Sequence, residues 1–186
     1  SLRGTALSLP SMKALIFLPF LLQITLGKPL NIPAFTAYLD PDPNGAQVSK
    51  DDGITDWNTA TNKIKWSGQL KNTGDLSIQV RLTLKKNEPL ELHLKLCDQF
   101  KRLTVTGTGA SMLADFGELL VTRNGYHTFI LSSPAPSGKI EELTLDGPPA
   151  KDAHFNFKPR RNSASVHLSY PIEREEEISA FYCELT

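Results

Sequence analysis

The stretch that decides the fold reads Leu76-Ser-Ile-Gln-Val-Arg-Leu-Thr-Leu84, Lys85-Lys-Asn-Glu-Pro89 and Leu90-Glu-Leu-His-Leu-Lys-Leu96. Apolar and polar residues alternate without a fault in both outer arms. A side-chain period of two is typical of a β-strand with one buried and one solvated face. The connecting residues include Asn87 and Pro89, which favour turns. The pattern therefore predicts a β-hairpin, and its apolar face needs a second layer to cover it.

Short strand-like segments continue on both sides of this stretch, separated by turn sequences about every eight to twelve residues. Asn124-Gly125 favours a tight turn between paired strands, so residues 116–122 and 126–131 predict a second hairpin. No segment has the period of about 3.6 residues that marks a helix. The remaining predicted strands cover residues 34–39, 64–70, 102–106, 140–145, 155–157, 165–170 and 180–185.

These features predict an all-β fold, an antiparallel and jelly-roll-like β-sandwich. Burial of apolar area at about 25 cal/mol per Å² makes a core of this size adequate for one domain. The residues expected in that core are Leu76, Ile78, Val80, Leu82, Leu92, Leu94, Phe129, Leu131, Leu143 and Leu145.

Residues 12–27 have the pattern of a secretory signal peptide. Lys13 gives the positive start, an apolar run follows, and Thr25 and Gly27 are small residues at the positions that a signal peptidase reads. The run is shorter than the roughly 20 apolar residues of a membrane span, so we expect a secreted protein without a span. Residues 1–11 precede Met12 without a structural pattern, and the sandwich is expected over residues 28–158.

Charge and motifs exclude several classes of function. The 20 basic and 20 acidic residues balance, which gives no electrostatic reason to expect nucleic acid or an anionic membrane as partner. The sequence has no Gly-x-Ser-x-Gly, His-Glu-x-x-His or phosphate-loop motif. Carboxylates are plentiful, so a glycosidase pair is not excluded by counting, but we expect a protein that is not an enzyme.

Trp57 is the leading candidate for a binding residue. It lies in a polar loop with Asp56, Asn58 and Asn62. An aromatic face flanked by amides and carboxylates suits a sugar ring, which needs apolar stacking and hydrogen bonds to its hydroxyls. The alternative is that the indole plugs one end of the sandwich core, as buried tryptophans do in other small sandwiches.

Arg160 and Arg161 are a second candidate, because paired arginines can clamp a carboxylate or sulfate of an acidic glycan. They can equally tie a crossing strand to acidic loops. His167 follows nearby and, like His93, alternates with apolar neighbours, so it points away from the core. Lone histidines of this kind are more often surface residues than ligands.

Metal and disulfide sites are weakly indicated. The two cysteines are too few for a disulfide scaffold or a zinc site, but Cys97 and Cys183 could form one bridge in an oxidising compartment. Calcium prefers oxygen ligands, although no loop here has EF-hand spacing. The carboxylates considered for calcium are Asp40, Asp42, Asp51 and Asp52.

The run Arg160-Arg-Asn-Ser-Ala-Ser-Val-His-Leu-Ser-Tyr170 resembles the family known as domain of unknown function 5077. In that family a paired arginine followed by Pro-Ser-Val-His-Leu closes the sandwich, and Ala164 stands here in place of the proline. The resemblance extends over residues 33–186. Further stretches that carry it are residues 52–58, 73–78, 125–126 and 143–147.

This resemblance implies a secreted domain that precedes a second one, the domain of unknown function 3472. Phe181-Tyr-Cys-Glu184 is similar to the junction, with Cys183 where the family has Asn, so residues 159–186 are expected to hold the last strands and that junction. The resemblance also implies a sandwich like that of carbohydrate-binding modules, and carbohydrate as ligand. The alternative function is a structural domain that packs against the second domain and binds no ligand of its own.

Overall fold

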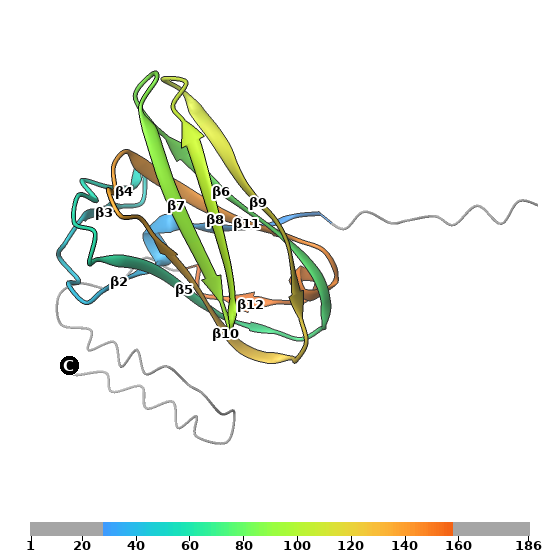
Figure 1. Ribbon diagram of the computed structural model, residues 1–186. Coiled ribbons are helices and arrows are strands. Elements are labelled where there is room, and N and C mark those ends of the chain that lie inside the picture. Colours follow the sequence, from blue (N-terminus) through green and yellow to red (C-terminus); the bar gives the residue numbers. More distant parts are fainter. Residues whose placement is uncertain (1–27, 158–186) are drawn as a thin grey trace, which may run out of the picture.

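The alternating segments form β-strands in the computed structural model, which describes residues 28–157 (Figure 1). Each long strand buries every second side chain, as the period of two requires. The elements are β1 (Leu30–Pro33), the short 3-10 helix η1 (Ala34–Thr36), β2 (Tyr38–Asp40), β3 (Gln47–Ser49), β4 (Gly53–Thr55), β5 (Lys63–Leu70), β6 (Gly74–Thr83), β7 (Pro89–Leu96), β8 (Gln99–Thr106), β9 (Ser111–Val121), β10 (Gly125–Ser132), β11 (Lys139–Asp146), the 3-10 helix η2 (Pro148–Ala150) and β12 (His154–Phe155).

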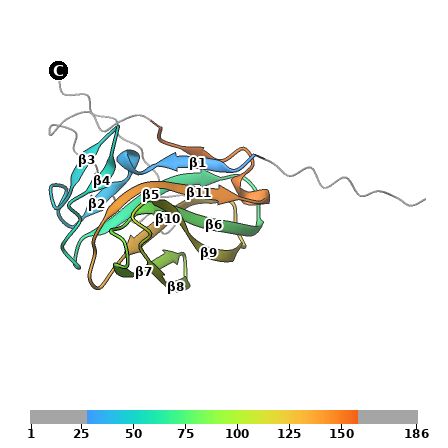
Figure 2. The same cartoon turned by 90° about the horizontal axis from the view of Figure 1, so that it is seen from above.

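The strands form two antiparallel sheets that pack face to face, which Figure 2 shows as two layers. Sheet 1 has the order β3-β4-β11-β6-β9, and β1 also pairs with β11. Sheet 2 has the order β12-β5-β10-β7-β8, and β2 also pairs with β5. This architecture confirms the predicted antiparallel β-sandwich. Within residues 28–157 no helix is long and apolar enough to cross a membrane.

The core lies between the two sheets and is continuous. All ten residues that the alternation predicts for it have no exposed side-chain area. Trp57, Trp66 and Phe129 are the bulkiest of the buried side chains. The apolar period of two therefore identifies the inward face of each strand correctly.

The predicted central hairpin is wrong, because its two arms lie in different sheets. β6 pairs with β9 and β11 in sheet 1, whereas β7 pairs with β8 and β10 in sheet 2. Their connection crosses from one layer to the other. Both strands bury their apolar face in the same core, so a connection between facing sheets leaves the same alternation as a hairpin.

The second predicted hairpin is wrong for the same reason, since β9 belongs to sheet 1 and β10 to sheet 2. Gly125 has a φ of 123°, but Asn124 is not among the residues with positive φ. The tight turn favoured by Asn-Gly needs positive φ at both positions, so it does not form. A tight hairpin forms instead between β7 and β8, through Cys97 and Asp98, with Cys97 at a φ of 51°.

Residues 34–39 do not form the single strand that was predicted. The chain turns through η1 instead, where the Thr36 hydroxyl donates to the Pro33 carbonyl at 2.8 Å, and strand geometry resumes at Tyr38. The strand predicted at 155–157 is the shorter β12, which begins one residue earlier, at His154, and ends at Phe155. Residues 1–27, with the predicted signal peptide, and 158–186, with the last two predicted strands, lie outside the described residues.

Two sheet-crossing connections stack on one another at one end of the sandwich. One joins β6 to β7 and the other joins β8 to β9. Asn87 N–H donates to Gly107 O at 2.8 Å, Gly107 N–H donates to Glu88 O at 2.8 Å, and Gly109 N–H donates to Leu84 O at 3.2 Å. A Cβ on Gly107 would overlap the carbonyl oxygen of Lys85 and lie 2.6 Å from the Leu84 Cβ. Glycine is therefore required for the two connections to approach this closely.

The two strands at the open side of the sandwich, β8 and β9, are joined by one side chain. The Gln99 amide donates to Leu120 O at 2.7 Å and accepts from Leu120 N–H at 3.1 Å. These are the backbone groups through which β9 would otherwise pair with a further strand. Gln99 thus links sheet 2 to sheet 1 at this side.

Candidate functional site

The loop between β4 and β5 is built around Trp57, which is 1% exposed. Its Nε1–H donates to Asn62 O at 2.9 Å. The buried Asn62 side chain in turn accepts from Asp42 N–H at 3.2 Å and donates to Asp42 O at 3.0 Å. These bonds pair the buried polar groups of the loop and fix the indole in the core.

A buried indole has no free face for a sugar ring, so the predicted stacking of Trp57 on a sugar is wrong. The alternative, that Trp57 plugs the end of the core, is what the structure shows. The polar neighbours suggested a binding loop, but Asn62 serves to satisfy the indole and the loop backbone instead. Asp56 and Asn58, on either side of Trp57, are exposed.

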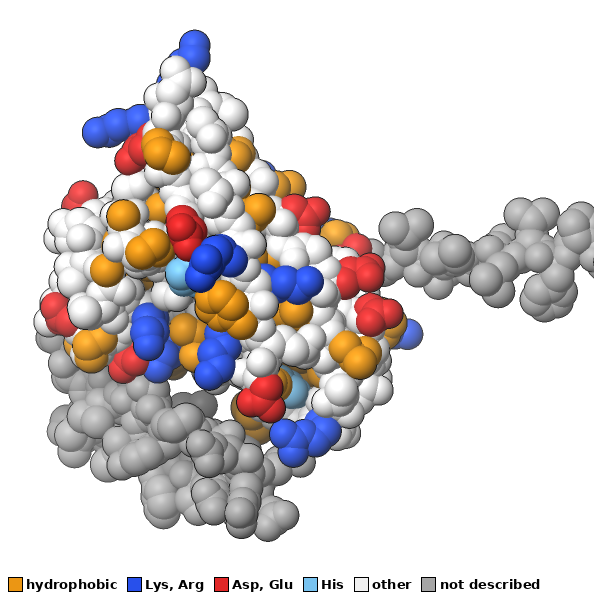
Figure 3. Space-filling view, viewed as in Figure 1, with side chains coloured by type: hydrophobic (Ala, Val, Ile, Leu, Met, Phe, Trp, Pro, Cys, Tyr) orange, Lys and Arg blue, Asp and Glu red, His pale blue; other side chains and the backbone are white. Residues whose placement is uncertain are grey.

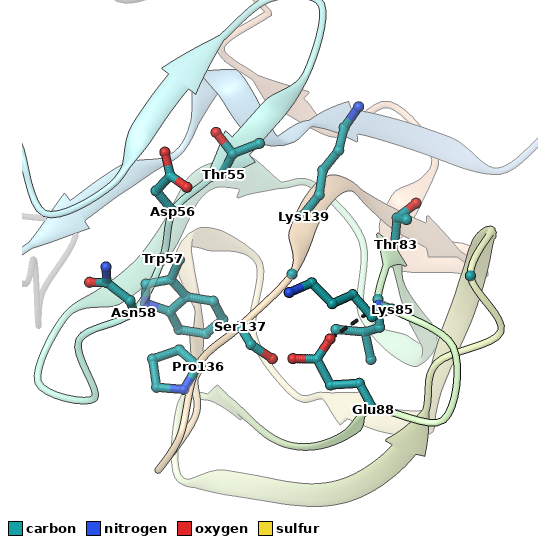
Figure 4. Close-up of a pocket in the computed structure, with 13 residues that line it drawn as sticks. Thr55, Asp56, Trp57, Asn58, Thr83, Lys85, Glu88, Pro136, Ser137 and Lys139 are labelled. Atoms are coloured by element: carbon teal, nitrogen blue, oxygen red, sulfur yellow. Dashed lines mark hydrogen bonds between the residues drawn. The ribbon is translucent and has the colours of Figure 1, made fainter.

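Asp56 and Asn58 line an open hollow of about 540 Å³, the larger of the two pockets described here. It lies where the chain leaves β4 and β6 and where it enters β11. Figure 4 shows Asp56 and Asn58 on one side of the pocket and Lys85 and Glu88 on the other. The remaining lining residues are Thr55, Trp57, Thr83, Leu84, Gly109, Pro136, Ser137, Gly138 and Lys139.

Some polar groups of this pocket already form hydrogen bonds or ion pairs with described residues, and others do not. Glu88 Oε2 accepts from Lys85 N–H at 3.1 Å, and the Lys139 ammonium contacts Asp52 at 3.2 Å. No residue that the structure describes pairs with the side chains of Asp56 or Ser137, or with the Lys85 ammonium. The pocket thus offers a carboxylate, a hydroxyl and an ammonium, which together can donate to and accept from a polar ligand.

A smaller pocket of about 330 Å³ lies on the other side of Lys139 and is lined by Phe35 and by charged residues. Lys139 belongs to both pockets, and its contact with Asp52 separates them. Phe35 is partly buried, and the carboxylates of Asp51 and Glu141 also line this hollow.

The four carboxylates considered for calcium do not gather into one site. Asp40 pairs with Lys65 at 2.6 Å, and Asp52 pairs with Lys139. Asp42 Oδ1 accepts from Asn44 N–H at 2.9 Å. Among residues 28–157 no group of three or more histidine, cysteine or acidic side chains is placed to hold a metal ion. The aspartates act as local ion-pair and turn residues instead.

Cys97 is exposed and forms no disulfide with a described residue. Its Sγ lies 3.2 Å from Nδ1 of His127, and partial burial raises the pKa of its thiol above the ordinary value. His93 lies on the outer face of sheet 2, as predicted. The remaining predicted site residues, Arg160, Arg161, His167 and Cys183, lie outside the described residues.

The other half of the larger pocket was missed by the sequence reasoning. Lys85 and Glu88 belong to the connection after β6, and Pro136 to Gly138 precede β11, whose first residue is Lys139. In the sequence these are turn residues far from Asp56. They meet only because β4, β11 and β6 are neighbours in sheet 1, an order that local patterns do not encode.

The sequence matches the model of one family, described as domain of unknown function (DUF5077), over residues 32–150. Among curated proteins, none matches the sequence. A CBM35 from Cellvibrio japonicus Abf62 is similar in structure, with a TM-score of 0.51, 12% identity, and coverage of 69% of this chain and 97% of that one. The CBM36-1 domain of a multidomain xylanase from the hindgut metagenome of Trinervitermes trinervoides is similar as well. Its TM-score is 0.50 at 12% identity, and the likeness covers 64% of this chain and 98% of that one.

A larger protein is also similar in part. The Podospora anserina GH26-CBM35 β-(1,4)-mannanase gives a TM-score of 0.53 with 15% identity, and the likeness covers 64% of this chain but 28% of the mannanase. This chain therefore spans about 28% of the length of that enzyme. At these identities the likeness is one of fold, and the shared fold is the β-sandwich of carbohydrate-binding modules.

Proposed function

Since this chain belongs to the DUF5077 family and has the sandwich fold of carbohydrate-binding modules, we propose that it is a non-catalytic module that binds carbohydrate in the pocket beside Asp56 and Asn58. The observation that carries the proposal is the free polar lining of that pocket. Loops at the ends of sandwiches are where such scaffolds hold ligands, because the strands keep the loop ends in place.

The polar groups of the pocket suit a neutral sugar better than an ion. Asp56, Ser137 and Lys85 offer acceptors and donors from three separate segments of the chain, which allows several hydroxyls to be bonded at once. The carboxylate and the ammonium offset each other in charge. The pocket lies open to solvent, and since the Trp57 indole is buried, hydrogen bonds rather than ring stacking supply the binding. We therefore expect the weak affinity of a binding module.

Asp56→Asn combined with Asn58→Ala should lower the affinity for the bound glycan at least about tenfold, because each lost hydrogen bond contributes about 1 kcal/mol. Asp56 has a φ of 55°, a conformation that asparagine tolerates, so the fold should be kept. The measurement is a glycan array on the wild-type domain, followed by titration calorimetry with the best ligand. Asp98→Asn, on the exposed β7–β8 turn, is the matched control and should bind normally.

The second candidate is a structural domain that packs against a following domain. The burial of Trp57 favours it, because this removes the aromatic platform expected of a sugar site. An array without a single bound glycan, together with unchanged melting of the Asp56→Asn and Asn58→Ala variant, would favour this candidate over the first.

Export from the cell is part of the proposal and rests on the signal-like residues 12–27. Expressed from Met12 in its own secretory route, the protein should appear outside the cell with Lys28, or a residue close to it, at its amino terminus. Amino-terminal sequencing of the exported material checks this. Retention in the cytosol with Met12 intact would contradict it.

A further inference from the structure

The two outer faces of the sandwich carry opposite charge, although the whole chain is neutral. The outward side chains of sheet 2, which we call the basic face, come from the positions that alternate with the buried ones on β2, β5, β7 and β8. Four of them are basic, Lys63, Lys65, Lys95 and Arg102, and two are acidic, Asp40 and Glu91.

The outer face of sheet 1 is acidic. The outward side chains of β6, β9 and β11 include two basic residues, Arg81 and Lys139, within the part of the chain that the structure describes. The carboxylates on the same strands are Asp75, Asp115, Glu118, Glu141, Glu142 and Asp146. The basic face is therefore the more positive of the two outer faces.

An exposed aromatic ring lies on the basic face, on its outermost strand β8. Phe100 is 54% exposed and stands opposite Lys95 in the β7–β8 register. Lys95 in turn stands opposite Ile130, and Ile130 opposite Lys65, so four side chains form one row across four strands. Strands lie about 4.8 Å apart, which places the backbones of Lys65 and Lys95 about 10 Å apart. Figure 3 shows this face, where basic side chains lie around a hydrophobic group.

Local contacts hold the Phe100 ring in place. The His93 ring meets the Phe100 ring edge-on, with centroids 5.2 Å apart. Glu91 contacts His93 at 2.6 Å and Arg102 at 3.2 Å. The hydrogen bond from His93, and then the charge of Arg102, keep the pKa of Glu91 below its ordinary value, so Glu91 stays ionised and orients both partners. No described residue pairs with the ammonium groups of Lys63 or Lys95, and these charges are free for a ligand.

We propose that the basic face binds an anionic polysaccharide, with Phe100 stacking on a sugar ring and Lys95 and Arg102 pairing with carboxylate or sulfate groups of the same chain. Aromatic rings pack on the apolar side of a sugar, and guanidinium and ammonium groups bind the two common acid groups of glycans. A flat sheet face accepts an extended chain, whereas the pocket at the end of the sandwich accepts a short one. The face shares no residue with either pocket, so it stands independently of the proposed function.

Titration calorimetry of the secreted domain with polygalacturonate and dextran sulfate as probes, and neutral dextran as reference, tests this proposal. We expect binding of at least one anionic probe, no binding of dextran, and weaker binding as salt rises. Lys95→Ala with Arg102→Ala should lower the affinity at least about tenfold, and Phe100→Ala should lower it by about five- to tenfold. Lys71→Ala with Lys151→Ala, and Leu120→Ala on the acidic face, are the matched controls for charge and for exposed apolar area.

Four results would overturn the proposal. The first is that neither anionic probe binds the wild type. The second is that the Lys71 and Lys151 control loses as much affinity as the Lys95 and Arg102 variant, which would mean electrostatic attraction without a defined site. The third is that neutral dextran binds as well as the anionic probes. The fourth is that the basic face pairs with the acidic face of a second copy, seen as self-association by sedimentation that the Lys95 and Arg102 variant abolishes. The Asp56→Asn and Asn58→Ala variant should bind the anionic probe with unchanged affinity. This result separates a failure of the basic-face proposal from a failure of the pocket proposal.

Discussion

Trp57→Ala is expected to lower the free energy of unfolding by about 3–5 kcal/mol, which is the range for truncating a large aromatic side chain in a packed core. The indole is 1% exposed and belongs to the continuous core between the sheets. Its removal leaves a cavity and also leaves the Asn62 carbonyl without its indole donor at 2.9 Å. In a domain of this size the melting temperature should fall by about 10–20 °C, measured by thermal unfolding followed by circular dichroism.

Trp57→Phe separates the two contributions to that loss. Phenylalanine fills most of the space but cannot donate to the Asn62 carbonyl, so this variant should cost about 1–3 kcal/mol. If Trp57→Ala melts within a degree or two of the wild type, the indole does not support the core. Glycan affinity would then need to be measured for the same variant, because the stacking role would be open again.

Gly107→Ala is expected to cost about 3 kcal/mol, the upper part of the usual range for forcing extra atoms into a packed site. The new methyl group would overlap the Lys85 carbonyl and press on Leu84, so the two stacked connections have to move apart. Their hydrogen bonds, including Gly107 N–H to Glu88 O at 2.8 Å, would lengthen. Chemical denaturation of the variant measures the loss.

Gly117→Ala is the matched comparison, because Gly117 has a φ of 70° but no atom within 4 Å of the added Cβ. It tests backbone strain alone and should cost about 1–2 kcal/mol. A Gly107→Ala variant as stable as Gly117→Ala, or more stable, would mean that the connections are not in close contact. Because Leu84 and Lys85 line the larger pocket, Gly107→Ala should also weaken any ligand bound there.

The sequence predicts the strands and the core well, because both follow from the period of two. Leu76 to Leu82 and Leu92 to Leu94 alternate with polar residues, and each apolar one is buried. The alternation does not predict which strands pair with one another. β6 and β7 both face the same core from opposite layers, so alternation is equally consistent with a hairpin and with a crossing between sheets.

The candidate site was only half predictable for a related reason. Asp56 and Asn58 could be chosen from their loop composition, and they do line the pocket. The burial of Trp57 could not be predicted from composition. Its indole N–H donates to the backbone carbonyl of Asn62, and a backbone partner leaves no signal in the sequence. Lys85 and Ser137 join the site through strand order in sheet 1, which depends on contacts between residues distant in the sequence.

The Gln99 amide that bonds both backbone groups of Leu120 has a consequence for how this domain behaves at high concentration. An outermost strand with free N–H and C=O groups invites the same strand of another molecule to add on, and repeated addition leads to amyloid-like growth. Here a single side chain mimics the incoming strand and occupies the hydrogen-bonding positions of Leu120, at a point where the exposed leucine would otherwise favour such growth. Gln99 therefore protects this edge of the sandwich from strand addition, and with it from aggregation.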